Sequence, residues 1–154
     1  MAESNIYKSS LSKSMDLCSR REYCTEEIRV KLESWGVAEK DREKILTALK
    51  KDNFINENRY AEAFVRDKFK YNKWGKVKIS ALLKMKKIPS DTIKESLELI
   101  DQDNYRKTLR DILASHRKSV KSKNNFELYG KLMRYGLSKG FESSLLHDIL
   151  DELL

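Results

Sequence analysis

Residues 66–87 of this 154-residue chain could bind anions, because they include nine lysines and arginines against one acid, Asp67. The net charge of this stretch is +8, which equals the formal net charge of the whole chain, so the remaining residues are neutral as a set. Cations at this density are typical of surfaces that contact phosphates or acidic side chains. The candidate binding residues are Arg59, Arg66, Lys70, Lys73, Trp74, Lys76, Lys78, Lys84 and Lys87.

Trp74 lies at the turn in the middle of this charge and has two interpretations. As a structural residue it would staple two helices together. As a functional residue it would offer an aromatic platform beside cations, either for stacking or as an interface anchor. The sequence leaves both interpretations open.

Catalytic patterns are missing from the sequence. It contains no GxxxxGK[ST], GxGxxG, HExxH or GxSxG motif. Cys18 and Cys24 match neither CxxC nor a zinc module, so reduced thiols are expected. His116, within a basic run, is expected to be solvated, and His147 is expected at the surface. We therefore predict no enzyme activity, no cofactor and no metal site.

Helical periodicity surrounds the basic stretch. Apolar residues recur at helical spacing over about 11–23, 25–35, 40–51, 56–74, 76–87 and 90–100, and the pattern continues to the C-terminus. Thr25, Asn56 and Ser90 are predicted N-caps, and Gly36 and Gly75 are predicted to end helices. One proline and five glycines are too few for a sandwich or barrel of many tight turns.

Much of the basic charge is predicted to form one exposed surface. On the helix that Asn56 caps, basic residues recur at spacings of 7, 4 and 3 on the side away from the apolar stripe. These residues are Arg59, Arg66, Lys70 and Lys73. Lys73, Lys76, Lys84 and Lys87 are then predicted to lie opposite Ile79 and Leu83 on the next helix. A second basic band lies one repeat further on, where a solvated face is a serious competing interpretation.

An internal repeat organises the chain. Aliphatic anchors at Val37, Ile88 and Leu137 are 51 and 49 residues apart, and aliphatic residues recur nine and five positions before them and nine and twelve after them. The columns are Ile28, Ile79 and Leu128; Leu32, Leu83 and Leu132; Leu46, Leu97 and Leu146; and Leu49, Ile100 and Ile149. One position before the anchors stand Gly36, Lys87 and Gly136. Five aliphatic columns in three copies argue against coincidence.

The repeat predicts an all-α fold of three tandem three-helix repeats that form an elongated, curved array. The expected boundaries are a flexible N-terminus at 1–10, a first module at 11–54, a second, basic module at 55–102, and a third module at 103–154.

Two modules carry recognisable motifs. In the first, SRREYCTEEIRVKLESWGV follows the pattern R-x-x-S-x-x-E-L-x-x-K-L-x-x-x-G, with Cys24 in place of serine. In the second, NENRYAEAFVRDKFKYNKWGKVKISALL follows D-x-x-[FY]-A-x-x-F-V-x-x-R and then G-x-x-x-I-x-x-x-L. Asn56 stands where aspartate is usual, Lys68 where arginine is, Lys76 where proline often is, and Lys87 where glycine precedes the anchor. Together these departures make that module more basic. With these motifs the chain resembles the RecX family of bacterial regulators of the RecA recombinase, from about Cys18 to the C-terminus.

The resemblance implies a non-enzymatic protein that binds along the helical groove of the RecA–DNA filament. Family members limit filament growth and inhibit RecA's ATPase, strand exchange and coprotease activities, in DNA repair and the SOS response. The implied partners are the RecA filament and single- or double-stranded DNA, bound without sequence specificity, and a monomer is expected.

The residues alone leave two alternatives open. One is a helical module that binds DNA directly, since three-helix units with a basic helix resemble helix-turn-helix folds. Its lysines suit phosphates better than base edges. The other is a structural helical adaptor. Since MAESNIYKSS has no apolar segment and no apolar run approaches the roughly 20 residues of a membrane span, a cytoplasmic protein without membrane contact is expected.

Overall fold

The computed structural model describes residues 5–154 and arranges them in nine helices, with no strand in that range. The helices are α1 (Asn5–Arg20), α2 (Thr25–Ser34), α3 (Glu39–Lys51), α4 (Glu57–Asn72), α5 (Lys76–Met85), α6 (Ser90–Glu98), α7 (Gln102–Arg117), α8 (Asn125–Ser138) and α9 (Ser143–Leu153). The prediction of an all-α fold is confirmed.

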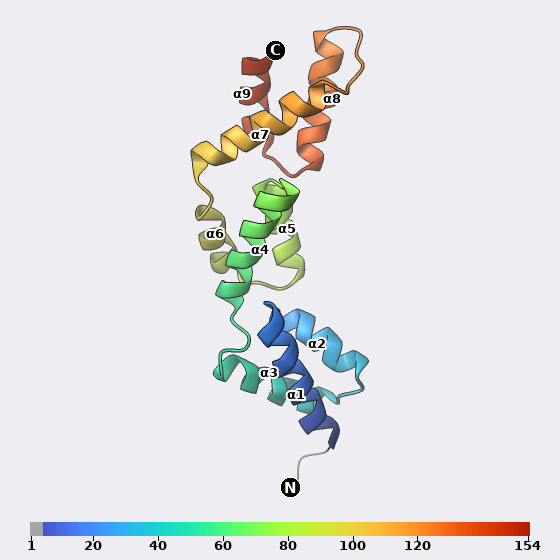
Figure 1. Cartoon of the computed structure of the whole chain (residues 1–154), viewed down its shortest axis with the longest axis vertical. Helices are drawn as coiled ribbons and strands as arrows, with labels where there is room; N and C mark the ends of the chain where they lie inside the picture. The colour runs from blue at the N-terminus through green and yellow to red at the C-terminus, as the bar shows by residue number, and fades with distance from the viewer. Residues whose placement is uncertain (1–4) are drawn as a thin grey trace.

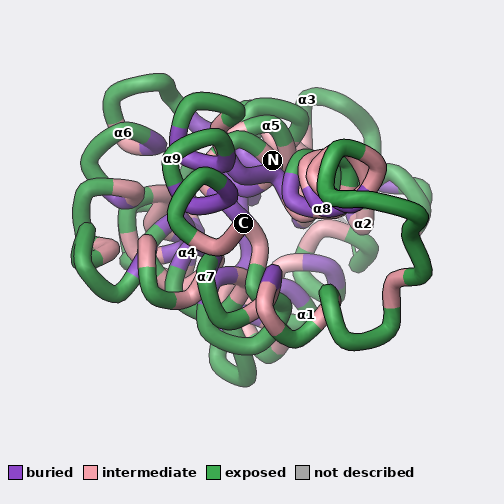
Figure 2. Tube along the Cα trace, turned by 90° about the horizontal axis from the view of Figure 1, so that it is seen from above, coloured by how far each residue is buried: buried purple, intermediate pink, exposed green. Residues whose placement is uncertain are grey.

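The helices form three groups that follow one another along an elongated molecule (Figure 1). α1 and α2 pack on α3, then α4, α5 and α6 pack together, and α7, α8 and α9 do the same. Seen along the long axis, buried positions face the middle and exposed positions face outward (Figure 2). The tandem repeat of three-helix units is therefore present, with its ends far apart.

The first two modules connect their second helix to their third helix in the same way. α2 and α5 are each 10 residues long, and each is followed by a residue with positive φ, Gly36 at 78° and Lys87 at 60°. The N–H groups of Val37 and Ile88 then donate to the carbonyls of Leu32 and Leu83, both at 3.1 Å. This bond across five residues closes a helix end and turns the chain into the next helix.

The third module has the same closure one helical turn later. α8 is 14 residues long, the positive-φ residue is Gly140 at 92°, and the N–H of Phe141 donates to the carbonyl of Gly136 at 3.2 Å. Phe141 is therefore the structural equivalent of Val37 and Ile88. The predicted anchor Leu137 is wrong, since its side chain is 46% exposed. Gly136 lies inside α8 and allows close packing against Leu146.

Several predicted boundaries also change. α1 begins at Asn5, and Ser10 is buried within it, so the flexible N-terminus expected at 1–10 is wrong for residues 5–10; residues 1–4 lie outside the described part. Cys24, not Thr25, is the N-cap of α2, and Pro89 precedes α6 where Ser90 was expected. Asn56 caps α4 as predicted and accepts a hydrogen bond from the N–H of Arg59 at 2.9 Å.

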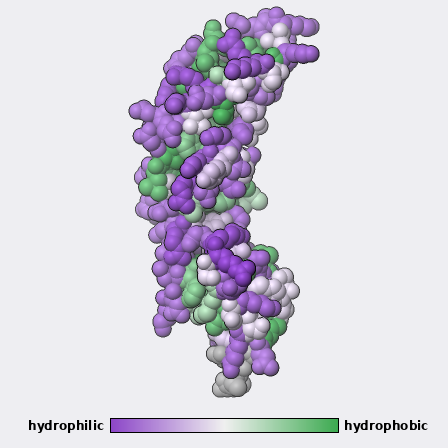
Figure 3. Space-filling model, in the orientation of Figure 1, coloured by the Kyte–Doolittle hydropathy of each residue, from purple (hydrophilic) through white to green (hydrophobic). Residues whose placement is uncertain are grey.

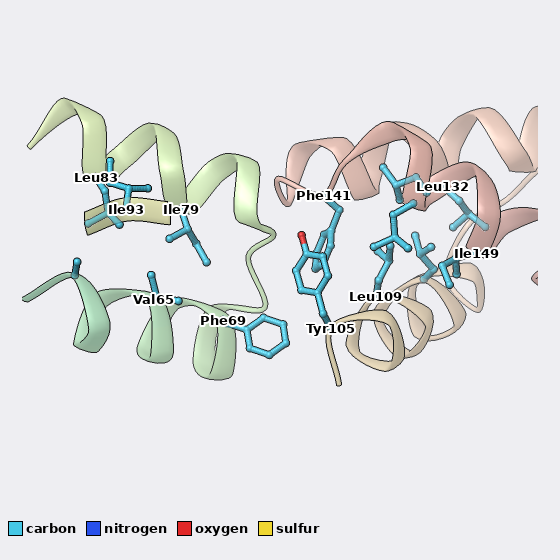
Figure 4. Close-up of a cluster of buried hydrophobic side chains, with 14 of the residues drawn as sticks. Val65, Phe69, Ile79, Leu83, Ile93, Tyr105, Leu109, Leu132, Phe141 and Ile149 are labelled. Atoms are coloured by element: carbon cyan, nitrogen blue, oxygen red, sulfur yellow. The ribbon is translucent and has the colours of Figure 1, made fainter. Parts of the chain in front are cut away.

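The apolar core has two parts. One lies within the first module, whereas the other runs without interruption through the second and third modules. Where this shared core passes from the second module to the third, Tyr105 packs between Phe69 and Phe141, whose ring centroids are 5.7 and 5.1 Å from its own (Figure 4). The six residues predicted to be buried are all buried: Ile28, Leu32, Ile79, Leu83, Leu128 and Leu132. No described helix is long and apolar enough to cross a membrane.

Candidate partner-binding surface

α4 presents three exposed cations of the predicted set. Arg66, Lys70 and Lys73 are exposed on the side of α4 that faces α6 and the start of α7. There they line a hollow of about 560 Å³ whose floor includes Phe69. Lys73 itself ends α4 in the left-handed conformation, with φ at 58°. The geometry leaves Lys70 and Lys73 without an ion pair among the described residues, whereas Arg66 is exposed but lies 3.5 Å from Asp67.

Arg59, in contrast, makes its polar contacts within the chain. Its Nε lies 2.6 Å from a carboxylate oxygen of Glu22, and its Nη2 donates to the carbonyls of Asn53 and Phe54. This arginine therefore ties α4 to the first module. We omit it from the candidate surface.

Trp74 is partly buried and packs against the core shared by the second and third modules. Its ring lies under two ammonium groups, with Lys78 Nζ 4.3 Å and Lys68 Nζ 5.1 Å from the ring centroid. This placement agrees with a stapling role. The ring also fixes the positions of the two ammonium groups, whereas the ammonium group of an isolated surface lysine would be mobile.

The lysines of α5 do not share one face. Lys76 is half-buried and lies 4.7 Å above the Tyr105 ring, so the prediction that it lies opposite Ile79 and Leu83 is wrong. Lys78 is half-buried on Trp74. Lys84 is exposed, as expected, and Lys87 is exposed but lies 3.6 Å from Glu26. The predicted single cationic surface is thus divided among several faces. On the face drawn in Figure 3, hydrophilic side chains are spread along the whole length of the molecule with hydrophobic patches between them.

α5 is held in place by the third module. The N–H groups of Gly75 and Val77 donate to the carbonyls of Lys139 and Gly140 at 2.7 and 2.9 Å. The N–H of Lys76 donates to the hydroxyl of Tyr105 at 2.9 Å. These are first-turn donors that have no partner within their own helix. Sequence reasoning missed this joint, because its partners come from distant parts of the chain.

Tyr105 completes the joint by donating its hydroxyl hydrogen to Glu142. Burial raises the pKa of Tyr105, and the hydrogen bond to Glu142 raises it further. The phenol therefore stays protonated and can act as donor and acceptor at once.

The joint between the first and second modules buries Cys24 of the first module in the core of the second and surrounds it with polar contacts. Glu57 accepts from the N–H of Thr25 at 3.0 Å, and Lys86 lies 3.2 Å from Glu27. Glu27 also accepts from the N–H of Cys24 at 3.1 Å. Together with the Arg59 ion pair, these contacts fix the first module against the basic one.

The second basic band is partly neutralised within the third module. Arg106 and Arg110 both pair with Glu152, and Arg117 donates to the carbonyl of Leu153. The remaining lysines of the band, Lys107, Lys118, Lys121 and Lys123, are exposed.

Each of the two histidines contacts a tyrosine of the same module. His116 is half-buried and stacks on Tyr135 with centroids 3.7 Å apart, so the expectation of a solvated side chain is wrong. His147 is exposed, as expected, and its Nδ1 lies 2.6 Å from the hydroxyl of Tyr129. Within residues 5–154 no cluster of three or more His, Cys, Asp or Glu side chains is arranged to hold a metal ion.

Comparisons with known proteins agree with this architecture. The family described as "RecX, second three-helix domain" matches residues 56–97, which include α4, α5 and most of α6. The crystal structure of RecX from Lactobacillus salivarius has a TM-score of 0.82, with 22% identity over 97% of each chain. Another crystal structure, of a regulatory protein RecX, has a TM-score of 0.86, with 21% identity over 96% of this chain and 72% of that one.

Curated relatives extend the similarity to sequence. Regulatory protein RecX of Prosthecochloris aestuarii is 28% identical, over all of this chain and 99% of the relative. The Clostridium beijerinckii protein of that name is also 28% identical, over all of this chain and 72% of its own. That of Clostridium botulinum strain Alaska E43 is 31% identical, over 83% of this chain and 60% of the relative. With the three-helix repeats, these similarities support the assignment of the chain to the RecX family of regulatory proteins.

Proposed function

We propose that this protein binds the filament that the RecA recombinase forms on DNA and restrains its extension. Its effects on ATP hydrolysis, strand exchange and coprotease activity follow from that restraint. The observation that carries the proposal is the pairing of an elongated three-module body with exposed cations on its middle module, in a chain that is similar to the RecX family.

The elongated shape suits a polymeric partner. A filament repeats the same acidic side chains and phosphates along its length, and each module of this chain can meet a different subunit. Weak contacts from several modules then combine through effective concentration, because the second and third contacts become intramolecular. A single bound molecule at a growing end would stop the addition of many subunits.

Direct binding to DNA is the second candidate. Arg66, Lys70 and Lys73 are exposed at one end of α4, and these residues make no ion pair within the described residues except that of Arg66 with Asp67 at 3.5 Å. Such cations would contact phosphates regardless of base sequence. In a RecA–DNA filament this contact would add to the protein contact.

The decisive experiment is steady-state ATP hydrolysis by RecA on single-stranded DNA, with rising amounts of this protein added to growing and to preformed filaments. We expect inhibition at substoichiometric amounts, and stronger inhibition of growing filaments. Inhibition that needs one molecule per RecA subunit would reject the end-blocking mechanism, and no inhibition at any ratio would reject the RecA assignment.

A matched pair of variants locates the contact. Arg66→Glu/Lys70→Glu/Lys73→Glu should lose most of the inhibition. Lys44→Glu/Lys50→Glu/Lys51→Glu changes the net charge equally, at exposed positions of α3 in the first module, and should retain it. Equal inhibition by both variants would move the contact away from α4.

A further inference from the structure

A groove crosses the joint between the first and second modules, lined by residues 21–31 of the first module and by residues of α4 and α5. It consists of two hollows of about 670 and 490 Å³ that share Arg21, Glu27, Leu82 and Lys86 as walls. We call this continuous hollow the joint groove. Its apolar lining comes from both modules: Tyr23, Val30, Phe64, Trp74, Leu82 and Met85.

The apolar lining is unusually open to solvent. Met85 is 74% exposed and Val30 is 55% exposed, and these residues come from α5 and α2 respectively. Exposed apolar side chains that converge from two modules on one hollow form a surface that a partner's apolar side chain could cover.

The charges around the joint groove are unbalanced. Its four acids already have cationic partners within the chain: Glu22 pairs with Arg59, Glu26 with Arg29, Glu27 with Lys86, and Asp67 with Arg66. Arg21, Lys31 and Lys68, which also line the groove, make no ion pair with a carboxylate among the described residues. The excess charge at the groove is therefore positive.

Aromatic rings hold these three cations at the two ends of the joint groove. At the first-module end the Arg21 guanidinium lies 3.6 Å and the Lys31 ammonium 5.9 Å from the centroid of Tyr23. At the other end the Lys68 ammonium lies 5.1 Å from the centroid of Trp74. Fixed positive charge thus flanks the apolar middle on both sides.

From this arrangement we propose that the joint groove binds a short acidic peptide segment of a protein partner, with an apolar side chain between its carboxylates. The carboxylates would meet Arg21 and Lys31 at one end and Lys68 at the other, and the apolar side chain would cover Leu82 and Met85. The inference rests on the proposed function only in taking the partner to be a protein.

Two features favour a peptide over single-stranded nucleic acid. Base stacking needs free aromatic faces, whereas the rings of Tyr23, Phe64 and Trp74 all lie beside cations and Tyr60 is buried. The other apolar side chains of the lining are aliphatic. In addition, the paired acids Glu22, Glu27 and Asp67 line the walls, and a phosphate backbone would bring one negative charge past them with every nucleotide. A peptide can instead place its N–H donors against those carboxylates.

The test measures fluorescence anisotropy of labelled probes mixed with the full chain. The first probe is a short peptide with a leucine and a phenylalanine flanked on both sides by aspartates and glutamates. The second has serine at both apolar positions, the third has asparagine and glutamine at every acid, and the fourth is oligothymidylate. We expect the first peptide to bind at least tenfold more tightly than the second or third.

Variants of the chain assign the binding to the joint groove. Lys31→Glu/Lys68→Glu removes one cation from each end and should weaken binding of the first peptide at least tenfold, whereas Lys44→Glu/Lys50→Glu on α3 should weaken it less than threefold. Val30→Ser/Met85→Ser changes only exposed side chains and should abolish the preference for the apolar probe. Far-UV circular dichroism and the thermal midpoint confirm that each variant is folded.

Three outcomes would overturn the inference: equal weakening by the two lysine pairs, no preference of the chain for the apolar probe, or loss of oligothymidylate binding alone in the groove variant. RecA hydrolysis measured in parallel separates this inference from the proposed function. Peptide binding with no effect on RecA would support the joint groove as a peptide site and reject RecA as the partner. RecA inhibition without peptide binding would support the proposed function and reject the joint groove as a peptide site.

Discussion

Gly75 and Gly140 lie against each other where the second module meets the third. A Cβ atom placed on Gly75 would lie 2.3 Å from the carbonyl oxygen of Gly140, and one placed on Gly140 would lie 2.2 Å from the Cβ of Lys78. Side chains do not approach backbone atoms this closely, so the two backbones can meet only without them. The contact brings the N–H groups of Gly75 and Val77 within hydrogen-bonding distance of their carbonyl partners.

The first prediction is that Gly75→Ala destabilises the chain. The added methyl must push apart two backbones, which costs about 1–3 kcal/mol for an overpacked site. Chemical denaturation followed by circular dichroism measures the change.

Gly130→Ala is the control for this prediction. Gly130 lies inside α8, where an added Cβ would meet only the Arg134 side chain at 3.6 Å. Because alanine favours helix over glycine by about 1 kcal/mol, this variant should be more stable than the parent. If both alanine variants gained stability, the close contact of Gly75 with Gly140 would not limit packing.

The second prediction concerns Lys87, which has the left-handed conformation that Gly36 and Gly140 have in the other modules. A side chain in that conformation costs roughly 1–2 kcal/mol, which replacement by glycine would recover. Part of the recovered stability is offset because glycine makes the unfolded chain more flexible. Lys87→Gly should therefore stabilise the chain by up to about 1 kcal/mol in urea denaturation.

Lys87→Gln separates conformation from charge. It keeps a side chain at the left-handed position and removes only the exposed ion pair with Glu26, so its effect should stay below about 1 kcal/mol. A glycine variant that is less stable than the glutamine variant would contradict the prediction.

The fold of the first two modules could be predicted closely from the sequence, because their helix ends coincide with the aliphatic anchors Val37 and Ile88. The third module could not. Leu128 and Leu132 are one helical turn apart, so a register that is wrong by four residues still buries the same face of α8. That wrong register makes all five columns aliphatic, whereas the register of the structure places Gly136 and Phe141 in two of them. Only the position of the left-handed glycine distinguishes Leu137 from Phe141 as the anchor, and the sequence offers both Gly136 and Gly140.

The candidate site was less predictable, because side-chain partners lie far apart in the sequence. The periodicity of α4 correctly places Lys70 and Lys73 on its outer side. It could not show that Arg59 pairs with Glu22, 37 positions away, or that Lys76 covers Tyr105, 29 positions away. Helical spacing describes one helix at a time, whereas these contacts arise where modules meet.

The third prediction concerns the buried thiols. Burial raises the pKa of Cys18 and of Cys24 to about 11, from an ordinary value of 9.0. Folding therefore favours the protonated thiols. Their contribution to stability is complete below pH 9 and is lost as the pH rises from 9 toward 11, because the unfolded chain releases these protons first.

The measurement compares the free energy of unfolding of the parent chain and of Cys18→Ala/Cys24→Ala between pH 7 and pH 10.5. The difference in unfolding free energy between the two proteins should stay constant up to about pH 8.5. Above that pH the parent should lose stability relative to the variant, as the linkage of protonation to folding requires. Parallel curves for the two proteins across the whole range would contradict the raised pKa values.

The last prediction tests whether the cations of α4 contact phosphates. Arg66→Gln/Lys70→Gln/Lys73→Gln removes three exposed charges without adding new repulsion. If each cation displaces a counterion from single-stranded DNA, the slope of log affinity against log salt should fall by about 0.7 for each contact, or about 2 for the three. Lys44→Gln/Lys50→Gln/Lys51→Gln lowers the net charge equally from α3 and should leave the slope within about 0.5 of the parent, because loss of distant charge removes no counterion-release site. An unchanged slope in the α4 variant would mean that these side chains form only a solvated face. If that variant nevertheless lost its inhibition of RecA, the cations of α4 would contact acidic protein side chains in the filament.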